Sequence, residues 1–207
     1  MAAKLNREVI ARAGLRLLDG SGADGITLRA LAAELGVQAP TLYWHVKSKQ
    51  DIFAAMASAI SQDAATATAA IDPDAPWQER LQRWAYAMRL SILSHRDGGR
   101  VFAGTFAADP ATYTVTEAAL TAWIDAGLPI EEAAQRMILL RHFIVGFCIE
   151  EQELGSLGDP VRWEELRDTL NPKIFPLTAQ ALPLIARSDA DDRFDRGLQL
   201  MLQLKPE

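Results

Sequence analysis

The chain has 207 residues, of which 49% are hydrophobic and 23% are charged, and its formal net charge is −6 at pH 7. This composition is typical of a folded, soluble protein with one large or two small domains, and it excludes a disordered chain. The first residues carry charges at Lys4, Arg7 and Glu8, and no later stretch has the apolar length needed to span a bilayer. We therefore expect a cytoplasmic protein with no membrane partner.

The charge is unevenly distributed along the chain. Residues 1–60 hold seven Lys or Arg and five Asp or Glu, whereas residues 61–207 hold fourteen and twenty-two. Only the first part can tolerate a polyanionic partner. The asymmetry modestly favours nucleic-acid binding by the N-terminal region.

Helical periodicity begins near the N-terminus. The segment NREVIARAGLRLLDG has apolar residues at helical spacing, which predicts a first helix capped by Asn6 and ended by Gly20. The segment TLRALAAEL predicts a second helix, with Thr27 as its N-cap and Gly36 as the residue that ends it. These two helices are short and close together in the sequence.

Two more helix starts follow directly. Pro40 suits the first turn of a short third helix that continues to His45. The segment SKQD predicts a capping box in which Ser48 is the N-cap and Asp51 stands three residues later, so a fourth helix opens here. The first 50 residues therefore form a compact helical unit.

The remainder of the chain is also predicted to be helical. An alanine-rich stretch is followed by IDPDAP, the expected boundary between two regions. The segment from 155 to 188 contains four prolines and is expected to be irregular, with short helical pieces. No strand pattern, repeat or glycine-rich phosphate loop occurs, so the predicted fold class is all-α. The helices are expected at about 75–94, 97–103, 110–126, 130–154 and 191–204.

The second and third predicted helices, joined by LGVQ, have the length and the glycine corner of a helix-turn-helix, which places its second helix in the DNA major groove. Three successive aromatic rings follow at 43–45, and they cannot all face a core because neighbouring residues point in different directions around a helix. Leu42 and Val46 are expected to face the core. Candidate DNA-contacting residues are Thr27, Leu28, Arg29, Gln38, Ala39, Pro40, Thr41, Tyr43, Trp44, His45 and Lys49.

Within this set Arg29 is expected to donate to a base as a bidentate group and Lys49 to contact a phosphate. The alternative interpretation is a small helical bundle whose aromatic residues belong to a core or to a protein contact.

The stretch TLRALAAELGVQAPTLYWHVKSKQDI resembles the DNA-binding region of the TetR-type transcriptional repressors. The segments PWQERLQRWAYAMRLSILSHRDG, VFAGT and HFIVGFCIEEQE follow in the order found in the tetracycline repressors of that family. The resemblance covers most of the chain to about residue 153. It implies an all-helical homodimer that holds double-stranded palindromic operator DNA and releases it when a small molecule binds.

The resemblance also implies the domain organisation. We expect a helix-turn-helix DNA-binding domain over residues 1–50 and a helical ligand-binding and dimerisation domain over residues 51–207. The helix at about 48–68 connects the two. The segments MILLRHFIVGF and FDRGLQLMLQL carry more apolar residues than one side of a surface helix needs, so we expect the dimer to form through the helices at 130–154 and 191–204.

One departure from the resemblance concerns the ligand. In the tetracycline repressors the ligand arrives chelated to magnesium and the motif VHLGT supplies a histidine to the metal, whereas here VFAGT places Phe102 there. We therefore expect an aromatic and apolar pocket without a metal or cofactor, for a small organic effector other than magnesium-tetracycline. Candidate ligand-binding residues are Trp84, Met88, Phe102, Thr105, Phe106, Met137, Ile138, Arg141, His142 and Glu150.

Each of these positions has a plainer alternative. Trp84 and Met88 stand four residues apart and could simply belong to the core. His142 could be a histidine satisfied by hydrogen bonding, and Glu150 could belong to a solvated acidic face.

Two other function classes are weighed against a repressor. An enzyme is the main alternative, but His95, His142 and Cys148 do not form a recognisable set of nucleophile, base and orienting group. Cys148 is expected to be a buried thiol without chemistry. HRDG at 95–98 resembles the catalytic loop of protein kinases but lacks its partner motifs, so a helix-ending turn is expected. The third class is a helical protein-binding adaptor.

Overall fold

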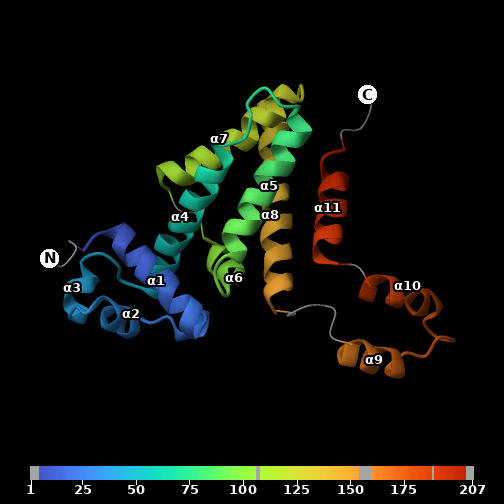
Figure 1. Cartoon of the computed structure of the whole chain (residues 1–207), viewed down its shortest axis with the longest axis horizontal. Coiled ribbons are helices and arrows are strands. Elements are labelled where there is room, and N and C mark those ends of the chain that lie inside the picture. The colour runs from blue at the N-terminus through green and yellow to red at the C-terminus, as the bar shows by residue number, and fades with distance from the viewer. Residues whose placement is uncertain (1–4, 106–107, 154–159, 188, 204–207) are drawn as a thin grey trace. The chain divides into compact units, whose positions relative to one another are not determined.

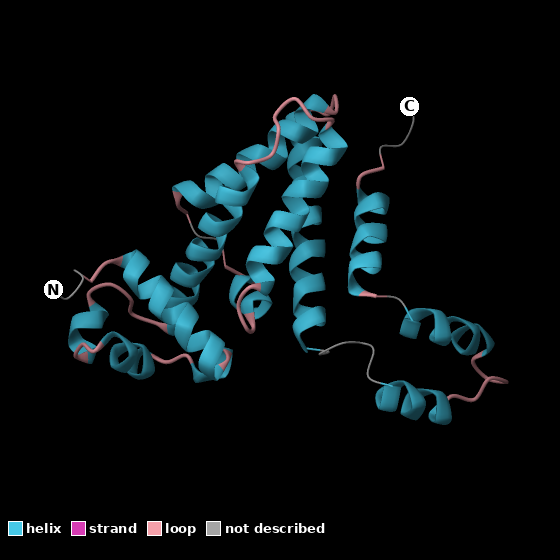
Figure 2. Cartoon of the chain, in the orientation of Figure 1, coloured by secondary structure: helices cyan, strands magenta, loops and turns pink. Residues whose placement is uncertain are grey.

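The computed structural model describes residues 5–105, 108–153, 160–187 and 189–203, and every regular element in this part of the chain is a helix (Figure 1; Figure 2). The prediction of an all-α fold is confirmed. Contacts divide the chain into two compact units, Met1–Ile149 and Glu150–Glu207. The elements of the first unit are α1 (Arg7–Ser21), the 3-10 helix η1 (Ala23–Gly25), α2 (Leu28–Leu35), α3 (Ala39–Tyr43), α4 (Lys49–Thr68), α5 (Trp77–Leu93), α6 (Gly98–Phe102), α7 (Pro110–Asp125) and most of α8 (Ile130–Glu153).

The first helix begins as predicted and ends later than predicted. The Asn6 side chain accepts a hydrogen bond from the Val9 N–H at 2.8 Å, which caps α1. Gly20 lies inside α1 and does not end it. The helix ends instead at Gly22, whose φ of 71° is in the left-handed region that favours glycine. The expected end at Gly20 was therefore wrong, because nothing in the sequence marks which of two nearby glycines adopts the positive φ.

The core of the first unit is built around α4, which packs against α1 on one side and against α5, α6 and α7 on the others (Figure 1). Its large buried residues are Ile52, Met56 and Ile60, all fully buried. The remaining buried positions are mostly alanines, whose small side chains let neighbouring helices approach closely. α1 packs along α4, α2 packs against α1, and α3 packs against α2.

The helices from α5 to α8 match the predicted segments to within a few residues. Asp109 caps α7 by accepting the Thr112 N–H at 2.9 Å, and Pro110 follows at the first helical position, where a missing N–H costs nothing. Gly127 has a φ of 88° just after α7. The helix expected at 130–154 is α8, which reaches Glu153, and residue 154 lies outside the described residues.

The second unit contains α9 (Pro160–Thr169), α10 (Pro176–Arg187) and α11 (Ala190–Met201). The segment from 155 to 188 was expected to be irregular with short helical pieces. The short helices are present as α9 and α10, but they cover most of the described residues, so the expected irregularity was wrong there. Pro160 and Pro176 are the first residues of these helices. Proline breaks a helix when it lies in the interior, but it fits the first turn, where its missing N–H would have no partner in any case. Pro183 lies inside α10.

Candidate functional site

The predicted helix-turn-helix is formed by α2 and α3. The Thr27 hydroxyl accepts a hydrogen bond from the Ala30 N–H at 3.0 Å and so caps α2. Gly36 ends α2 in the left-handed conformation, with a φ of 65°. Leu42 and Val46 are buried, as expected. The inner side of α3 is thereby fixed to the core, and its other side faces outward.

The outward side of α3 is aromatic. Tyr43 is 50% exposed and Trp44 is 87% exposed. Large apolar rings that are exposed to solvent in this way mark a surface that a binding partner can cover. α3 ends at Tyr43, two residues before the predicted end at His45. Trp44 and His45 follow in a turn. Of the other candidates on α2 and α3, Thr27, Arg29, Gln38, Pro40, Thr41 and His45 are exposed, whereas Leu28 and Ala39 are partly buried.

The start of α4 is fixed beside this surface by the predicted capping box. The Ser48 hydroxyl accepts the Asp51 N–H at 3.1 Å, and the Asp51 carboxylate accepts the N–H groups of Ser48 at 3.0 Å and Lys47 at 2.8 Å. The hydrogen bond from the Lys47 N–H is the main cause that lowers the pKa of Asp51. Lys49 is exposed at the first position of α4, and its ammonium lies 5.3 Å from the centre of the Phe53 ring.

An internal cavity of about 50 Å³ lies among α4, α5, α6, α7 and α8. It is lined by seven of the ten residues predicted to bind a ligand: Trp84, Met88, Phe102, Thr105, Met137, Ile138 and Arg141. These residues come from three separate stretches of the sequence, and the fold brings them around one space.

Of the other three predicted residues, His142 and Glu150 are described and do not line this cavity. His142 follows Arg141 on α8 and is exposed, because successive residues of a helix point in different directions. Glu150 is exposed and is not part of the lining. Phe106 lies outside the described residues.

Sequence reasoning missed the lining residues from α4 and α7. Thr112, Val115 and Thr116 recur at helical spacing on α7, and Ala57 and Ser61 do so on α4. This spacing marks one face of each helix. It did not show that the face borders a cavity, because small and hydroxyl residues occur equally in ordinary helix contacts.

Polar groups in the cavity wall are mostly used within the protein. The Trp84 indole N–H donates to the Val115 carbonyl at 2.8 Å, and the Thr105 hydroxyl donates to the Phe102 carbonyl at 2.8 Å. The Arg141 guanidinium donates to the Thr105 carbonyl at 3.0 Å, and desolvation by burial lowers its pKa. The Thr112 hydroxyl oxygen is buried and has no hydrogen-bond partner among the described residues.

A second, more open hollow of about 530 Å³ lies between α5 and α7 and the end of α4. Its lining includes Arg80, Tyr113 and Glu117. Trp84 borders both the small cavity and the larger hollow.

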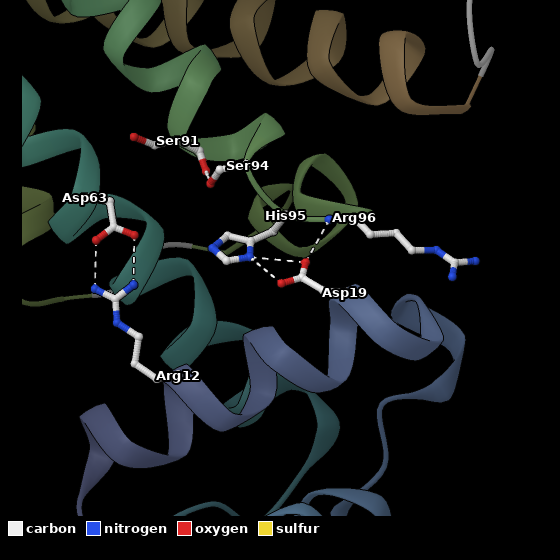
Figure 3. A network of polar contacts seen from close by, with 7 residues as sticks. All are labelled: Arg12, Asp19, Asp63, Ser91, Ser94, His95 and Arg96. Atoms are coloured by element: carbon white, nitrogen blue, oxygen red, sulfur yellow. Dashed lines mark hydrogen bonds and ion pairs between the residues drawn. The ribbon is translucent and has the colours of Figure 1, made fainter.

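The turn after α5 connects the helices of the cavity to α1 (Figure 3). Asp19 of α1 accepts the Arg96 N–H at 3.1 Å and lies 3.0 Å from the His95 ring nitrogen. Asp97, which precedes α6, accepts the Ala23 N–H at 2.7 Å. This is the segment HRDG, and its predicted role as a helix-ending turn is confirmed.

A second link joins α1 to α4. The Arg12 guanidinium donates to both carboxylate oxygens of Asp63, at 2.9 Å and 2.7 Å (Figure 3). This two-bond geometry holds α1 against the middle of α4. The helix that carries Lys49 is thus tied to α1, the helix that precedes the helix-turn-helix.

The residues at the cavity do not fit a chelated magnesium ion. Phe102 presents a ring without a metal-binding lone pair, and in the described part of the chain no three His, Cys, Asp or Glu side chains gather in a way that could hold a metal. Cys148 is buried, as expected. None of the helices in the described ranges has the length and apolar character of a membrane span.

Comparison with known families gives two matches that together span most of the chain. The family described as bacterial regulatory proteins, tetR family, matches residues 10–56. The family described as tetracyclin repressor-like, C-terminal domain, matches residues 71–203. The helix-turn-helix falls in the first match and the cavity residues from Trp84 to Arg141 in the second.

Individual relatives agree with these matches. The chain is 34% identical over 200 residues to the tetracycline repressor protein class E of Escherichia coli, covering 97% of this chain and 90% of that protein. A possible TetR family transcriptional regulator from Streptomyces coelicolor A3(2) is 35% identical, with a TM-score of 0.81 over 95% of this chain and 97% of that one. A TetR variant from Acinetobacter baumannii AYE in complex with minocycline is 27% identical, with a TM-score of 0.73 over 96% and 94%.

Proposed function

Since the chain belongs to the tetR family of bacterial regulatory proteins, whose members are ligand-responsive transcriptional repressors, we propose that it binds a palindromic operator as a homodimer and releases it when a small organic effector enters the cavity beside Trp84. Residues 1–50 read the DNA, and residues 51–207 bind the effector and the second protomer. The observation that carries the proposal is the exposed aromatic side of α3, on a helix-turn-helix whose Arg29 is also exposed.

Chemistry supports a DNA partner for this side. Tyr43 and Trp44 offer apolar surface to thymine methyl groups, and the Arg29 guanidinium matches the acceptor pair of a guanine edge. Lys49 and the free N–H groups at the start of α4 suit a phosphate. A protein-binding adaptor would need no cationic groups around its aromatic rings.

The effector is proposed to be an organic molecule bound without a divalent metal. A magnesium chelate would meet Phe102 where it needs an electron-pair donor, and the wall around it is made of Trp84, Met88 and Met137. The methionines are flexible side chains that can adapt to an aromatic guest. The cavity of about 50 Å³ must widen to admit one, since ligand pockets are several hundred Å³.

Contacts in the first unit support a route from the cavity to the DNA-reading helices. Phe102 and Asp97 stand at the two ends of the short helix α6: Phe102 lines the cavity and Asp97 accepts the Ala23 N–H. An effector that displaces Phe102 therefore pulls on the segment just before α2. Moving α2 and α3 changes the distance between the two reading units of a dimer, and half-sites about one helical turn apart no longer match.

The experiment is a selection of bound sequences from random DNA, followed by gel shifts of the selected operator at increasing salt. A repressor gives a two-fold symmetric site and an affinity that falls steeply with ionic strength, because phosphate contacts release counterions. An enzyme or an adaptor gives no selected sequence. Failure to enrich any sequence at low salt would refute the proposal.

A further inference from the structure

The effector cavity contains a cation without an anionic partner. Of the described residues that line it, only Arg141 is charged, and no carboxylate in the described ranges pairs with it. Other arginines of the first unit, such as Arg12 and Arg80, do have carboxylate partners. Arg141 is partly buried, and its pKa is lowered because burial penalises the charged form. An anionic group beside the Arg141 guanidinium would favour its charged form and so offset the cost of burying it.

The hydrogen-bond donors of Arg141 are only partly used. Both of its hydrogen bonds leave from Nη2, to the carbonyls of Thr105 at 3.0 Å and Phe102 at 3.4 Å. The hydrogens on Nε and Nη1 have no acceptor among the described residues. A guanidinium has five N–H donors in a planar fork, so several remain for the two oxygens of one acidic group.

Two other residues of the cavity wall suit an aromatic acid. The Phe102 ring lies 5.3 Å from the guanidinium carbon, so an aromatic surface is already stacked against the cation. The Thr112 hydroxyl oxygen is buried in the same wall and has no partner among the described residues. Such a hydroxyl can donate to a carboxylate oxygen.

We propose that the effector is an aromatic molecule carrying an acidic group, most simply a carboxylate, whose oxygens accept hydrogen bonds from Arg141 and from the Thr112 hydroxyl. This rests on the proposed function, because it assigns the ligand class of the same cavity. The small cavity, at about 50 Å³, is several times the roughly 10–15 Å³ that holds one water, so it has room for the acidic group. The ring lies against Trp84 and Met88, and it needs a shift of those side chains toward the open hollow.

Binding is measured by calorimetry on the full chain without DNA. The probes are benzoate, naphthoate and phenylbenzoate, each compared with its primary amide, which has a similar shape and no charge. We expect at least one acid to bind roughly tenfold or more tightly than its amide, as charge-assisted hydrogen bonds are stronger than neutral ones. Equal affinity of acid and amide, or no saturable binding of any acid, would overturn the proposal.

Variants then locate the acid preference. In Arg141→Gln the preference is expected to fall to about threefold or less, and in Thr112→Val the acid is expected to lose a few-fold in affinity. The matched control is Arg136→Gln, because Arg136 is on the same helix, does not line the cavity and pairs with Glu132 at 2.8 Å. An acid preference that persists in Arg141→Gln would overturn the proposal. The comparison of acid with amide on the unmodified chain needs no variant and stands if Arg141→Gln does not fold.

The calorimetry separates this inference from the proposed function. It contains no DNA, so a chain that selects no operator still reports whether acids bind. If naphthoate binds through Arg141 but leaves an operator complex intact, the proposed ligand class is supported and the release of DNA by this ligand is refuted. If another neutral compound releases the operator and acids do not bind, the proposed function stands and this inference fails.

Discussion

Trp44 has the largest exposed fraction of the described large apolar residues, at 87%, although it follows directly on a helix whose Leu42 is fully buried. Exposing an indole to water is unfavourable unless another surface covers it. The adjacent Tyr43 is half exposed, and the cations Arg29 and Lys49 are exposed on the same unit. At the scale of single residues, these exposed side chains are the ones we propose to read DNA.

The first prediction separates base contacts from phosphate contacts. Arg29→Ala or Tyr43→Ala should reduce operator binding toward the level of unrelated DNA, since each lost base contact costs roughly 1–3 kcal/mol and a dimer loses it in both half-sites. Lys49→Ala should weaken all sequences alike and lower the salt slope by about one. Gel shifts on operator and scrambled DNA measure both effects. The control is Arg83→Ala, an exposed arginine on α5; unchanged specificity in both Arg29→Ala and Tyr43→Ala would contradict helix-turn-helix readout.

The second prediction uses two buried tryptophans with different hydrogen bonding. Trp84 donates to the Val115 carbonyl at 2.8 Å, whereas the Trp123 indole nitrogen is buried with no partner among the described residues. Replacing either by Phe removes similar volume, but only Trp84→Phe loses a hydrogen bond. The Trp84→Phe substitution should therefore lower the free energy of unfolding by about 0.5–1.5 kcal/mol more than the Trp123→Phe substitution does. Urea denaturation of both variants tests this, and a larger loss in Trp123→Phe would show the bond to be unimportant.

At the scale of elements, the third prediction concerns the start of α4. Ser48→Ala should lower the free energy of unfolding by about 1 kcal/mol, because the Asp51 N–H loses its acceptor. Asp51→Asn should also destabilise at neutral pH. The pKa of Asp51 is lowered on folding, so its contribution is present above the ordinary value of 3.8 and is lost as pH falls through the lower, folded value. Denaturation of Asp51→Asn and the unmodified chain should therefore converge in acid; a constant difference down to low pH would count against the capping role.

Helix existence was predictable from the sequence because caps act locally. Asn6, Thr27 and Ser48 each accept the N–H three residues later, an interaction that depends only on adjacent residues. The end of α1 was missed, since Gly20 and Gly22 differ in surroundings rather than in sequence signal. Gly22 has a positive φ and lies against the side chain of Asp97, which is more than seventy positions later in the sequence. The residues next to Gly22 in the sequence do not indicate such a contact.

The candidate cavity was predictable only in part, for the same reason. The family resemblance supplied positions on α5, α6 and α8, whereas the α7 residues Thr112, Val115 and Thr116 emerged from the packing. The prolines of the second unit led to a different wrong prediction. They were interpreted as helix breaks, yet Pro160 and Pro176 begin helices. Only the tertiary structure decides between those two roles.

At the scale of the whole molecule, the fourth prediction concerns assembly. Leu139 of α8 is 54% exposed and Leu200 of α11 is 66% exposed, which is more apolar surface than these helices need if they face water. We expect a homodimer through these helices at micromolar concentration by analytical ultracentrifugation. Leu139→Glu and Leu200→Glu should shift it toward monomer, because a carboxylate buried in an apolar interface is costly. Leu90→Glu, at an equally exposed leucine of α5, is the control. A monomeric unmodified chain would exclude this assembly.

The last prediction concerns release of the whole complex from DNA. Tetracycline with magnesium should leave the operator complex intact at low micromolar concentration, because Phe102 offers no ligand to the chelated cation. A cation buried without that partner is poorly compensated, a cost on the order of a few kcal/mol and so roughly a hundredfold or more in affinity. The positively charged Arg141 guanidinium in the same wall repels the chelated cation further.

The measurement is a titration of the operator complex with tetracycline, with and without magnesium, in the unmodified chain and in Phe102→His. Histidine restores a nitrogen ligand at this position, so any response to tetracycline should appear first in that variant and should depend on magnesium. Phe102→Leu is the matched control, because it removes the ring and supplies no ligand. Magnesium-dependent release of the unmodified chain at low micromolar tetracycline would refute the proposed metal-free effector.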